Sequence, residues 1–489
     1  MRYKICAAME ERMPFVPTPS QHEAMLHLAD FLLSSSGRPT LVMNGYAGTG
    51  KTAILRALCD IAEEGGYRLV LMAPTGRAAK VLSAATARQA MTIHRTIYRQ
   101  ESNGYDSHFG IGFNGYRHTL YIVDEASMIG DNFSGETEFG SGRLLTDMVG
   151  YIFSQEASRL LIVGDPAQLP PIGMERSSAM DKRILESMGL DVDMVWLTDV
   201  VRQELDSDIL INAVGVRKLI DQETAWSGGY PHLKAGAESD VVRVSGAELI
   251  ETLTTAYDTY GQENVLVVTR SNKRASRFNQ GIRGSVLMTE EQISRGDLLM
   301  VAKNNYMWLS RMQAEERAAE DGTSDFKYVK GGDFIANGDI CEVKRVRRYK
   351  EMYGLHFADV LLSFIEHDGI DIELRLIMDC LNSEMPKLTT EEERRFYELV
   401  EQDYSEIGDK RKRYTAIRND EWFNALQVKF AYAVTCHKAQ GGQWEAVFID
   451  IGYTPAESID KQWLQWLYTA MTRAKKRLYL VNFPDEFFS

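Results

Sequence analysis

Residues 45–52 read Gly-Tyr-Ala-Gly-Thr-Gly-Lys-Thr and constrain the fold of this chain more than any other stretch. They fit the pattern G-x-x-x-x-G-K-[ST] at every fixed position. The apolar residues 41–43 before them predict a short buried strand, and residues 53–58 after them predict a helix. A glycine loop between a strand and a helix directs backbone N–H groups and a helix N-terminus at phosphates. The stretch therefore predicts a phosphate-binding loop, called the P-loop below.

Two side chains of the P-loop have expected chemical roles. Lys51 supplies positive charge for the β- and γ-phosphates of a nucleoside triphosphate, and Thr52 supplies a hydroxyl for Mg²⁺. The other P-loop residues that we expect to bind the nucleotide are Gly45, Ala47, Gly48, Thr49 and Gly50.

The pattern of apolar runs predicts more than one domain. A chain of 489 residues is too long for a single core. Strand-like runs at residues 41–43, 69–72, 120–123, 160–163 and 195–197 alternate with helical stretches, which predicts a mostly parallel, doubly wound sheet. A second alternating block begins near residue 206, with its clearest strand at 265–268. Residues 306–425 carry short β-like runs and much charge, which predicts a small β-barrel inserted into the second block.

Composition excludes some classes of protein. No run of about 18 apolar residues occurs, so no membrane span is expected. Five scattered cysteines without a C-x-x-C pair argue against a zinc site or a disulfide framework and favour the reducing cytoplasm. A net charge of −14 counts against nucleic acid as a partner when taken alone. A locally basic groove on an acidic body, or a channel that relies on stacking, leaves that partner open.

Five further polar residues predict catalysis at the P-loop. The strand at 120–123 ends in Asp124 and Glu125, which suit a Mg²⁺ ligand and a residue that activates water. Gln168 follows the next strand and can sense a γ-phosphate or the attacking water. Arg202 and Arg473 are candidates for stabilising charge on the transferred phosphoryl group. Arg473 comes from the second block, so hydrolysis would require the two domains to close on each other.

Taken together, these stretches resemble a superfamily 1 helicase of the 5′-to-3′ branch, the group of the Dda and RecD helicases. The family's motifs occur in order at Gln21, 45–52, 73–80, 92–94, 124–128, 164–171, Arg202, 269–272, 432–441 and 468–473. Gln21 matches the family's adenine-reading glutamine. A capping box of Ser20 and Glu23 is expected to begin the helix that carries it. Gln440 and Gly441 are further nucleotide-binding candidates.

The resemblance implies two RecA-like domains with ATP and Mg²⁺ between them. The expected boundaries are 1–94 with 120–205 for the first domain, and 206–305 with 426–489 for the second. It also implies a short hairpin pin at 95–119 and an SH3-like barrel at 306–425, where 337–339 resembles the family's N-G-D turn. Trp422 and Phe423 could pack against this insert or touch DNA, and we expect packing.

The resemblance places a DNA strand across the tops of both domains. Hydroxyls, backbone amides and a lysine suit phosphates rather than bases. Aromatic residues of the pin interval could instead stack on a base or wedge the fork, or they could pack beneath a loop. The residues expected near DNA are Pro74, Thr75, His94, Phe109, Phe113, Thr435, His437 and Lys438. His94 and His437 could alternatively be core histidines.

The sequence thus predicts an ATP-dependent DNA helicase, a monomer in the cytoplasm, that moves 5′-to-3′ on single-stranded DNA and unwinds duplex DNA. Roles in replication, repair or recombination, with other proteins of those processes, follow from the resemblance. Two alternatives stay open: a non-unwinding ATPase subunit of a RecD-type nuclease assembly, and an RNA-directed helicase. The polarity follows from the resemblance alone. Residues 131–142 have no assigned function.

Overall fold

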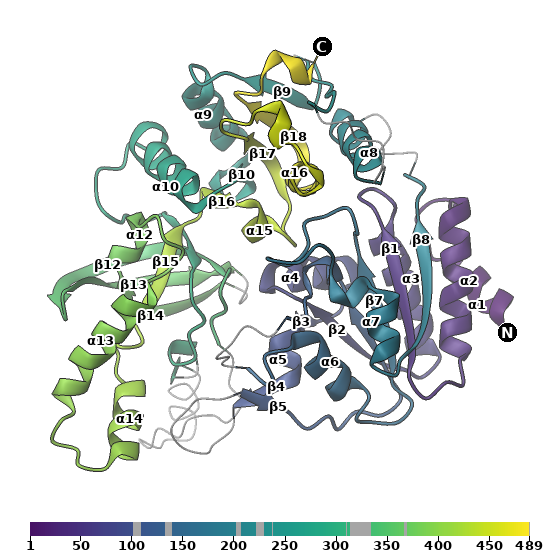
Figure 1. The fold of residues 1–489 in the computed structure, drawn as a ribbon, viewed down its shortest axis with the longest axis horizontal. Coiled ribbons are helices and arrows are strands. Elements are labelled where there is room, and N and C mark those ends of the chain that lie inside the picture. The colour runs from purple at the N-terminus through teal and green to yellow at the C-terminus, as the bar shows by residue number, and fades with distance from the viewer. Residues whose placement is uncertain are drawn as a thin grey trace.

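The computed structural model describes residues 1–100, 109–132, 139–201, 207–221, 229–236, 238–309, 311–312, 334–365 and 369–488. Figure 1 shows two α/β units side by side, with a β-barrel next to the second one. This arrangement confirms the predicted α/β fold with parallel sheets and the presence of a small barrel.

The first sheet has six strands in the order β3-β2-β6-β7-β1-β8, and all its neighbours pair in parallel. Each strand-like run that the sequence indicated before residue 200 lies inside one of these strands. The strands are β1 Pro39–Gly45, β2 Arg68–Ala73, β3 Ala90–Thr92, β6 Thr119–Val123, β7 Arg159–Gly164 and β8 Asp191–Leu197. Since β6, β7 and β1 are neighbours, the residues that follow them meet at one edge of the sheet.

Helices cover both faces of the first sheet. One core packs the apolar sides of the first three helices against the sheet, and a second core packs later helices on the opposite face. The helices of this unit are α1 Arg2–Glu10, α2 Pro19–Leu33, α3 Lys51–Glu64, α4 Gly76–Thr86, α5 Ile93–Ile97, α6 Leu144–Ile152 and α7 Lys182–Ser187. A separate antiparallel pair, β4 Tyr98–Gln100 and β5 Phe109–Ile111, extends from α5.

The second sheet has five parallel strands in the order β16-β10-β17-β18-β9. Its strands are β9 Val241–Val244, β10 Val265–Thr269, β16 Ala433–Thr435, β17 Trp444–Asp450 and β18 Ala474–Val481. Its helices are α8 Asp208–Asp221, α9 Leu249–Tyr260, α10 Asn272–Gly281, α15 Cys436–Ala439 and α16 Lys461–Met471. The helix α16 is almost wholly buried, because it packs against its own sheet and against the first unit.

The barrel closes through five strands, β11 to β15. They are β11 Leu298–Val301, β12 Ile340–Met352, β13 Leu355–Phe364, β14 Ile370–Ile377 and β15 Leu426–Phe430. The first and last strands, β11 and β15, lie outside the interval 306–425. The sequence pattern assigned these two apolar runs to the second α/β block, whereas in the structure they are strands of the barrel. Three helices, α12 Asp379–Asn382, α13 Thr390–Asp403 and α14 Lys410–Arg418, lie between β14 and β15. Trp422 and Phe423 pack against this unit, as expected.

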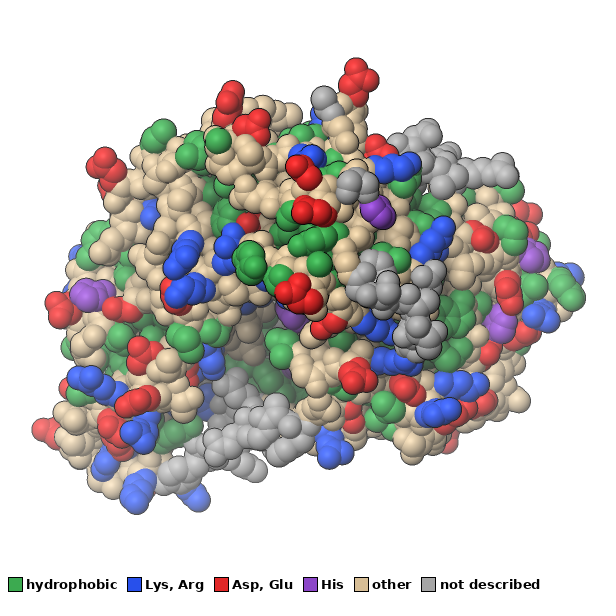
Figure 2. All heavy atoms as spheres, turned by 45° about the horizontal axis from the view of Figure 1, so that its top comes forward, with side chains coloured by type: hydrophobic (Ala, Val, Ile, Leu, Met, Phe, Trp, Pro, Cys, Tyr) green, Lys and Arg blue, Asp and Glu red, His purple; other side chains and the backbone are tan. Residues whose placement is uncertain are grey.

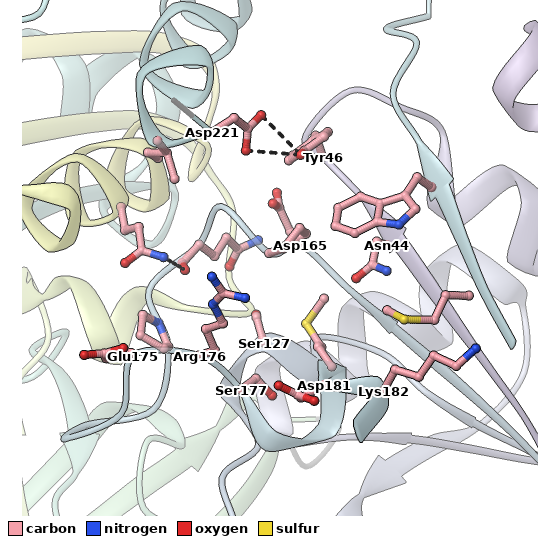
Figure 3. Close-up of a pocket in the computed structure, with 18 of the residues that line it drawn as sticks. Asn44, Tyr46, Ser127, Asp165, Glu175, Arg176, Ser177, Asp181, Lys182 and Asp221 are labelled. Carbon is pink, nitrogen blue, oxygen red and sulfur yellow. Dashed lines mark hydrogen bonds between the residues drawn. The ribbon is translucent and has the colours of Figure 1, made fainter. Parts of the chain in front are cut away.

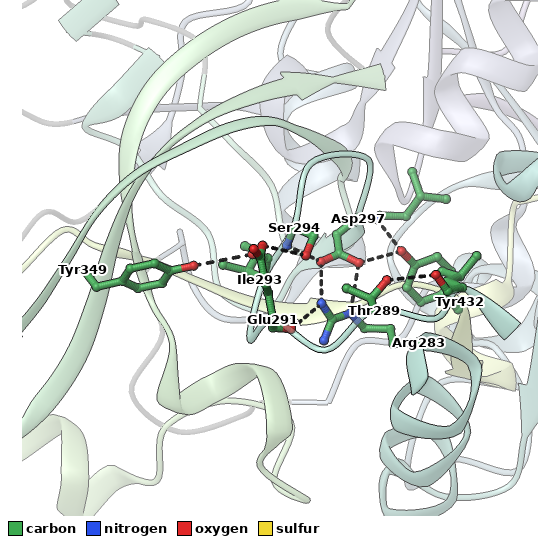
Figure 4. Close-up of polar contacts among 10 residues, drawn as sticks. Arg283, Thr289, Glu291, Ile293, Ser294, Asp297, Tyr349 and Tyr432 are labelled. Atoms are coloured by element: carbon green, nitrogen blue, oxygen red, sulfur yellow. Dashed lines mark hydrogen bonds and ion pairs between the residues drawn. The ribbon is translucent and has the colours of Figure 1, made fainter. Parts of the chain in front are cut away.

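A buried ion pair fastens the barrel to the second α/β unit (Figure 4). Arg283 donates to both carboxylate oxygens of Asp297, at 3.0 and 2.9 Å, immediately before β11 begins. Tyr432, just after β15, donates its hydroxyl to the same carboxylate at 2.8 Å. The two points where the chain crosses between the barrel and the α/β unit are therefore joined through Asp297.

The helix α2 begins differently from the expectation. Thr18, not Ser20, is the N-cap, and its partner in the capping box is Gln21, not Glu23. Pro19 explains the shift, because proline favours the first position of a helix and so fixes Thr18 as the cap. In the described part of the chain, no helix is long and apolar enough to cross a membrane.

Candidate nucleotide-binding site

The P-loop connects the end of β1 to the start of α3, as the pattern predicted. Gly48 and Gly50 have φ angles of 73° and 78°, which side chains other than glycine rarely adopt. A Cβ atom on Gly45 would lie 2.7 Å from Lys51 Cγ, and one on Gly50 would lie 2.5 Å from Gln21 Nε2. Conformation and space therefore both require glycine at this turn.

The P-loop offers a cradle that fits a polyphosphate. Within the described residues, the backbone N–H groups of Gly48, Gly50, Lys51 and Thr52 donate to no protein acceptor. Lys51 Nζ donates to the carbonyl oxygens of Gly45, at 2.6 Å, and Tyr46, at 2.9 Å. In this structure the Lys51 ammonium group is hydrogen-bonded to two neutral carbonyl oxygens. Phosphate oxygens would be stronger acceptors, because an ionised acceptor forms the stronger hydrogen bond. Thr52 lies exposed in the first turn of α3.

Two carboxylates, Asp124 and Asp165, interact electrostatically with Lys51, and a third, Glu125, interacts with both of them. Asp124 and Glu125 follow β6, and Asp165 follows β7. Burial, together with the Glu125 carboxylate, raises the pKa of Asp124 to about 6, and the Lys51 charge opposes that shift. Burial also raises the pKa of Asp165. The partly buried carboxylates of Asp124 and Glu125 suit a divalent cation, whose charge would favour their ionised forms.

Gln21 braces the P-loop. Its side chain is fully buried, its Oε1 accepts from Thr18 N at 2.9 Å, and its Nε2 donates to Thr49 O at 2.9 Å. Gln21 thus connects the N-terminus of α2 to the P-loop. Contact with adenine stays a prediction.

The second α/β unit reaches the P-loop through α16. The Tyr468 hydroxyl accepts a hydrogen bond from Ala47 N at 2.9 Å and donates one to Asp165 Oδ2 at 2.7 Å. Next to it, Thr469 Oγ1 accepts from Leu169 N at 2.8 Å. From the segment before β17, Gln440 Nε2 donates to Leu169 O at 2.8 Å. The P-loop and residues 164–171 are therefore in direct contact with the second unit.

Arg473, the arginine expected to act on phosphate, lies buried at the end of α16. It donates to the carbonyl oxygens of Thr469, at 3.0 Å, and Gly442, at 3.2 Å. Gly441 lies against the start of α4, where a Cβ atom would come within 2.7 Å of Ala78 Cβ. The other candidate arginine, Arg202, lies outside the described residues.

A polar cavity of about 560 Å³ lies between the two units beside the P-loop (Figure 3). Its lining includes Asn44 from β1, Tyr46 from the P-loop, Asp221 from α8, and Gln168. Gln168 is buried, and its Oε1 accepts no hydrogen bond from the described residues. The role expected for Gln168, orienting the attacking water molecule, stays a prediction.

The residues expected near DNA form two groups. In the first group, Pro74 and Thr75 follow β2, Thr435 ends β16, and His437 and Lys438 lie in α15, which follows β16. Thr75 caps α4 and Thr435 lies at the start of α15. A Cβ atom on Gly441 would lie 3.1 Å from Thr75 Oγ1, so the segment after α15 lies beside the start of α4. Burial lowers the pKa of His437.

The second group surrounds the β4–β5 pair. His94 contacts the rings of Tyr98 and Phe139, and burial lowers its pKa to about 4. Phe109 is 8% exposed and packs between Phe139 and Tyr306, whereas Phe113 is 89% exposed. Of the two phenylalanines, Phe113 is thus the one open to solvent. Residues 101–106, with their Asn-Gly signal, lie outside the described residues.

Sequence reasoning missed Tyr468 and Asp165 as functional partners. An isolated tyrosine in an apolar helix is typical of a core residue, and nothing in the pattern reveals that its hydroxyl meets the P-loop. Figure 2 shows acidic and basic side chains interspersed over one face of the molecule, so net charge gave little guide to the site.

Comparison with known proteins agrees with this geometry. Residues 17–222 match a family model described as an AAA domain, and residues 430–481 match one described as a UvrD-like helicase C-terminal domain. The ATP-dependent RecD2 DNA helicase of Deinococcus radiodurans is 27% identical over 308 residues, which cover 60% of this chain and 38% of that protein. An uncharacterised protein of Methanocaldococcus jannaschii, MJ1519, is 23% identical over 470 residues, covering 90% of this chain and 36% of that protein. The chain spans less than two fifths of the length of either relative.

Solved Pif1 helicase structures are also similar. One described as unwinding forked double-stranded DNA has a TM-score of 0.46 and 14% identity, with coverage of 97% of this chain and 94% of that chain. A Bacteroides Pif1 helicase in complex with ADP-AlF3 and single-stranded DNA has a TM-score of 0.46 and 13% identity, covering 97% and 95%.

The glycine loop, the carboxylates beside it and the parallel sheet define a P-loop NTPase. More particularly, the chain is similar over part of its length to a RecD2 DNA helicase, and its residues 430–481 match the C-terminal domain of UvrD-like helicases.

Proposed function

We propose that the chain is an ATP-dependent DNA helicase that translocates 5′-to-3′ on single-stranded DNA and unwinds duplex DNA. The observation that carries the proposal is the contact of Tyr468 with both the P-loop and Asp165. A site that joins two α/β units can convert nucleotide turnover into relative movement of those units. The similarity to a RecD2 DNA helicase supports DNA as the substrate.

In this proposal, Mg²⁺-ATP binds at residues 45–52, where Thr52 and Asp124 hold the metal ion. When bound, the nucleotide and metal supply the γ-phosphoryl group and its charge compensation. Lys51 neutralises phosphate oxygens, Glu125 orients and deprotonates a water molecule, and Gln168 orients that water through its available oxygen. Arg473 and Arg202 stabilise developing charge. Arg473 must exchange its bonds to backbone carbonyls for a phosphate oxygen to do so.

The finer organisation also belongs to the proposal. Residues 1–94 with 120–205, and 206–305 with 426–489, act as RecA-like motor domains. The antiparallel pair β4–β5 forms the base of a separation pin at 95–119. The five-stranded barrel acts as an SH3-like module. Partners are single-stranded and duplex DNA, and the chain acts as a monomer.

Stimulation of ATP hydrolysis by polynucleotides tests this function. The purified chain should hydrolyse ATP slowly alone and faster with single-stranded DNA, and Lys51→Ala should remove both activities. Equal rates with and without DNA would contradict a translocating helicase. Stronger stimulation by single-stranded RNA would favour the RNA-directed alternative. DNA-stimulated hydrolysis without strand separation would favour the non-unwinding subunit.

A further inference from the structure

A small pocket lies where the barrel meets the second α/β unit, and Figure 1 shows β15, β16, α10 and α12 near one another there. Its volume is about 30 Å³, about the space that one water molecule takes in the liquid. It therefore has room for one oxygen atom of a larger group. Most of its polar lining can donate hydrogen bonds, and these residues are Asn272, Ser276, Ser383, Lys429, Thr435 and Lys438.

Two half-buried lysines face this pocket from different units. Lys429 belongs to β15 of the barrel, and its Nζ donates to Ser383 O at 2.7 Å. Lys438 belongs to α15 of the second α/β unit. Burial lowers the pKa of Lys429 to about 8; the neighbouring Cys380 opposes this shift, and the Lys438 charge adds a smaller lowering effect. Burial also lowers the pKa of Lys438.

No carboxylate balances this pair in the part of the chain that the structure describes. Other lysines of the barrel unit do have acidic partners: Lys303 contacts Glu393 at 2.9 Å, and Lys344 contacts Glu342 at 2.7 Å. Two like charges that share a partly dry pocket are unfavourable in the free protein. A bound anion would remove that cost, and an ammonium group suits a phosphate oxygen as a point charge.

We propose that Lys429 and Lys438 together hold one backbone phosphate of a single-stranded nucleic acid, so that the barrel and the second α/β unit grip the same strand. The inference rests on the proposed function in taking nucleic acid as the ligand. It adds a contact from the barrel, which sequence reasoning did not assign to the strand. The small pocket reads no base, so the contact is independent of sequence.

Salt-dependent binding of a fluorescent oligothymidylate tests this contact. Lys429→Met keeps the length of the side chain and removes its charge. It should weaken binding about three- to tenfold at moderate salt and reduce the slope of log K against log salt by about 0.7. Lys344→Met is the matched control, because it removes a barrel lysine that already has a carboxylate partner; its affinity and slope should equal those of the wild type.

Thermal melting separates binding from folding. Lys429→Met should melt no lower than the wild type, because an uncompensated half-buried charge is replaced by an apolar group. Ser276→Asp leaves both lysines in place and supplies a competing carboxylate, so it should also weaken binding. Wild-type affinity and slope in both variants would overturn the inference while leaving the proposed function intact. A wild-type chain that binds no oligothymidylate would overturn both.

Discussion

Tyr468 and Asp165 lie 303 residues apart in the sequence, and a hydrogen bond of 2.7 Å joins the tyrosine hydroxyl to the carboxylate. The same hydroxyl accepts from the P-loop amide of Ala47. Because Tyr468 is buried, neither bond is easily replaced by water. One side chain of the second α/β unit thus forms hydrogen bonds with two parts of the nucleotide-binding site in the first unit.

Tyr468→Phe should uncouple the two units. The change removes one hydroxyl and leaves a buried carboxylate and a P-loop amide without that partner, at a cost of about 1–3 kcal/mol. We expect DNA-stimulated kcat to fall at least about tenfold, with a smaller change in the rate without DNA. Tyr479→Phe is the control, because this tyrosine of β18 stacks on Phe448 away from the P-loop. Equal stimulation in Tyr468→Phe and the control would contradict the coupling role.

Lys51→Ala should abolish ATP hydrolysis while the fold persists. The substitution removes the ammonium group that faces Asp124 and Asp165, and it also breaks two bonds to loop carbonyls. We expect kcat to fall at least about a hundredfold. Circular dichroism should match the wild type, and steady-state hydrolysis gives the rate. A variant that keeps more than a tenth of wild-type turnover would refute this role.

Arg473→Ala should retain nucleotide binding and lose turnover, because a guanidinium group on the phosphoryl oxygens acts mainly late in the reaction. A fall in kcat of about a thousandfold is expected. Arg473→Lys tests the need for the planar fork and should recover little activity. Binding of a fluorescent ATP analogue monitors affinity, and thermal melting accounts for the lost bonds to Thr469 and Gly442. Near-normal kcat in Arg473→Ala would rule out the assigned role.

His94 should make folding stability depend on pH. Its pKa is about 4 in the folded state, where burial disfavours the charged ring, against about 6.5 when unfolded. The unfolded chain therefore binds a proton more readily, and stability falls as pH falls through 6.5 and levels off below 4. The total loss is roughly 3 kcal/mol.

His94→Phe keeps an aromatic ring beside Tyr98 and Phe139 and removes the titration. In urea unfolding at pH 7 and pH 5, the wild type should lose more stability than this variant. Parallel losses in both proteins would show that His94 does not carry the effect.

The buried pair of Arg283 and Asp297 should stabilise the junction with the barrel. Asp297→Asn removes the charge that accepts from Arg283, Ser294 and Tyr432, and leaves a buried guanidinium group without its counter-ion. The expected cost is about 3–5 kcal/mol in urea unfolding. Glu373→Gln breaks exposed pairs with Arg345 and Arg347 on the same barrel and should cost less than about 1 kcal/mol. Equal costs would contradict a special role for the buried pair.

The nucleotide site was the part most open to prediction. Glycine spacing and apolar runs located the P-loop, and the strand ends at Asp124 and Gln168 followed from the same alternation. The barrel was harder to delimit, because an apolar run such as 298–301 fits a parallel sheet and a barrel strand equally well. Contacts between residues far apart in the sequence could not be predicted. The residues next to Tyr468 or Lys429 in the sequence do not indicate which side chains the fold places beside them.

Strand separation on tailed duplexes tests the central claim most directly. The purified chain, with ATP and Mg²⁺, would be given matched duplexes that differ only in carrying a 5′ or a 3′ single-stranded tail. A 5′-to-3′ helicase should separate the 5′-tailed duplex preferentially, and Lys51→Ala should separate neither. Preferential separation of the 3′-tailed duplex would contradict the polarity, and separation of neither by an active ATPase would contradict unwinding by this chain.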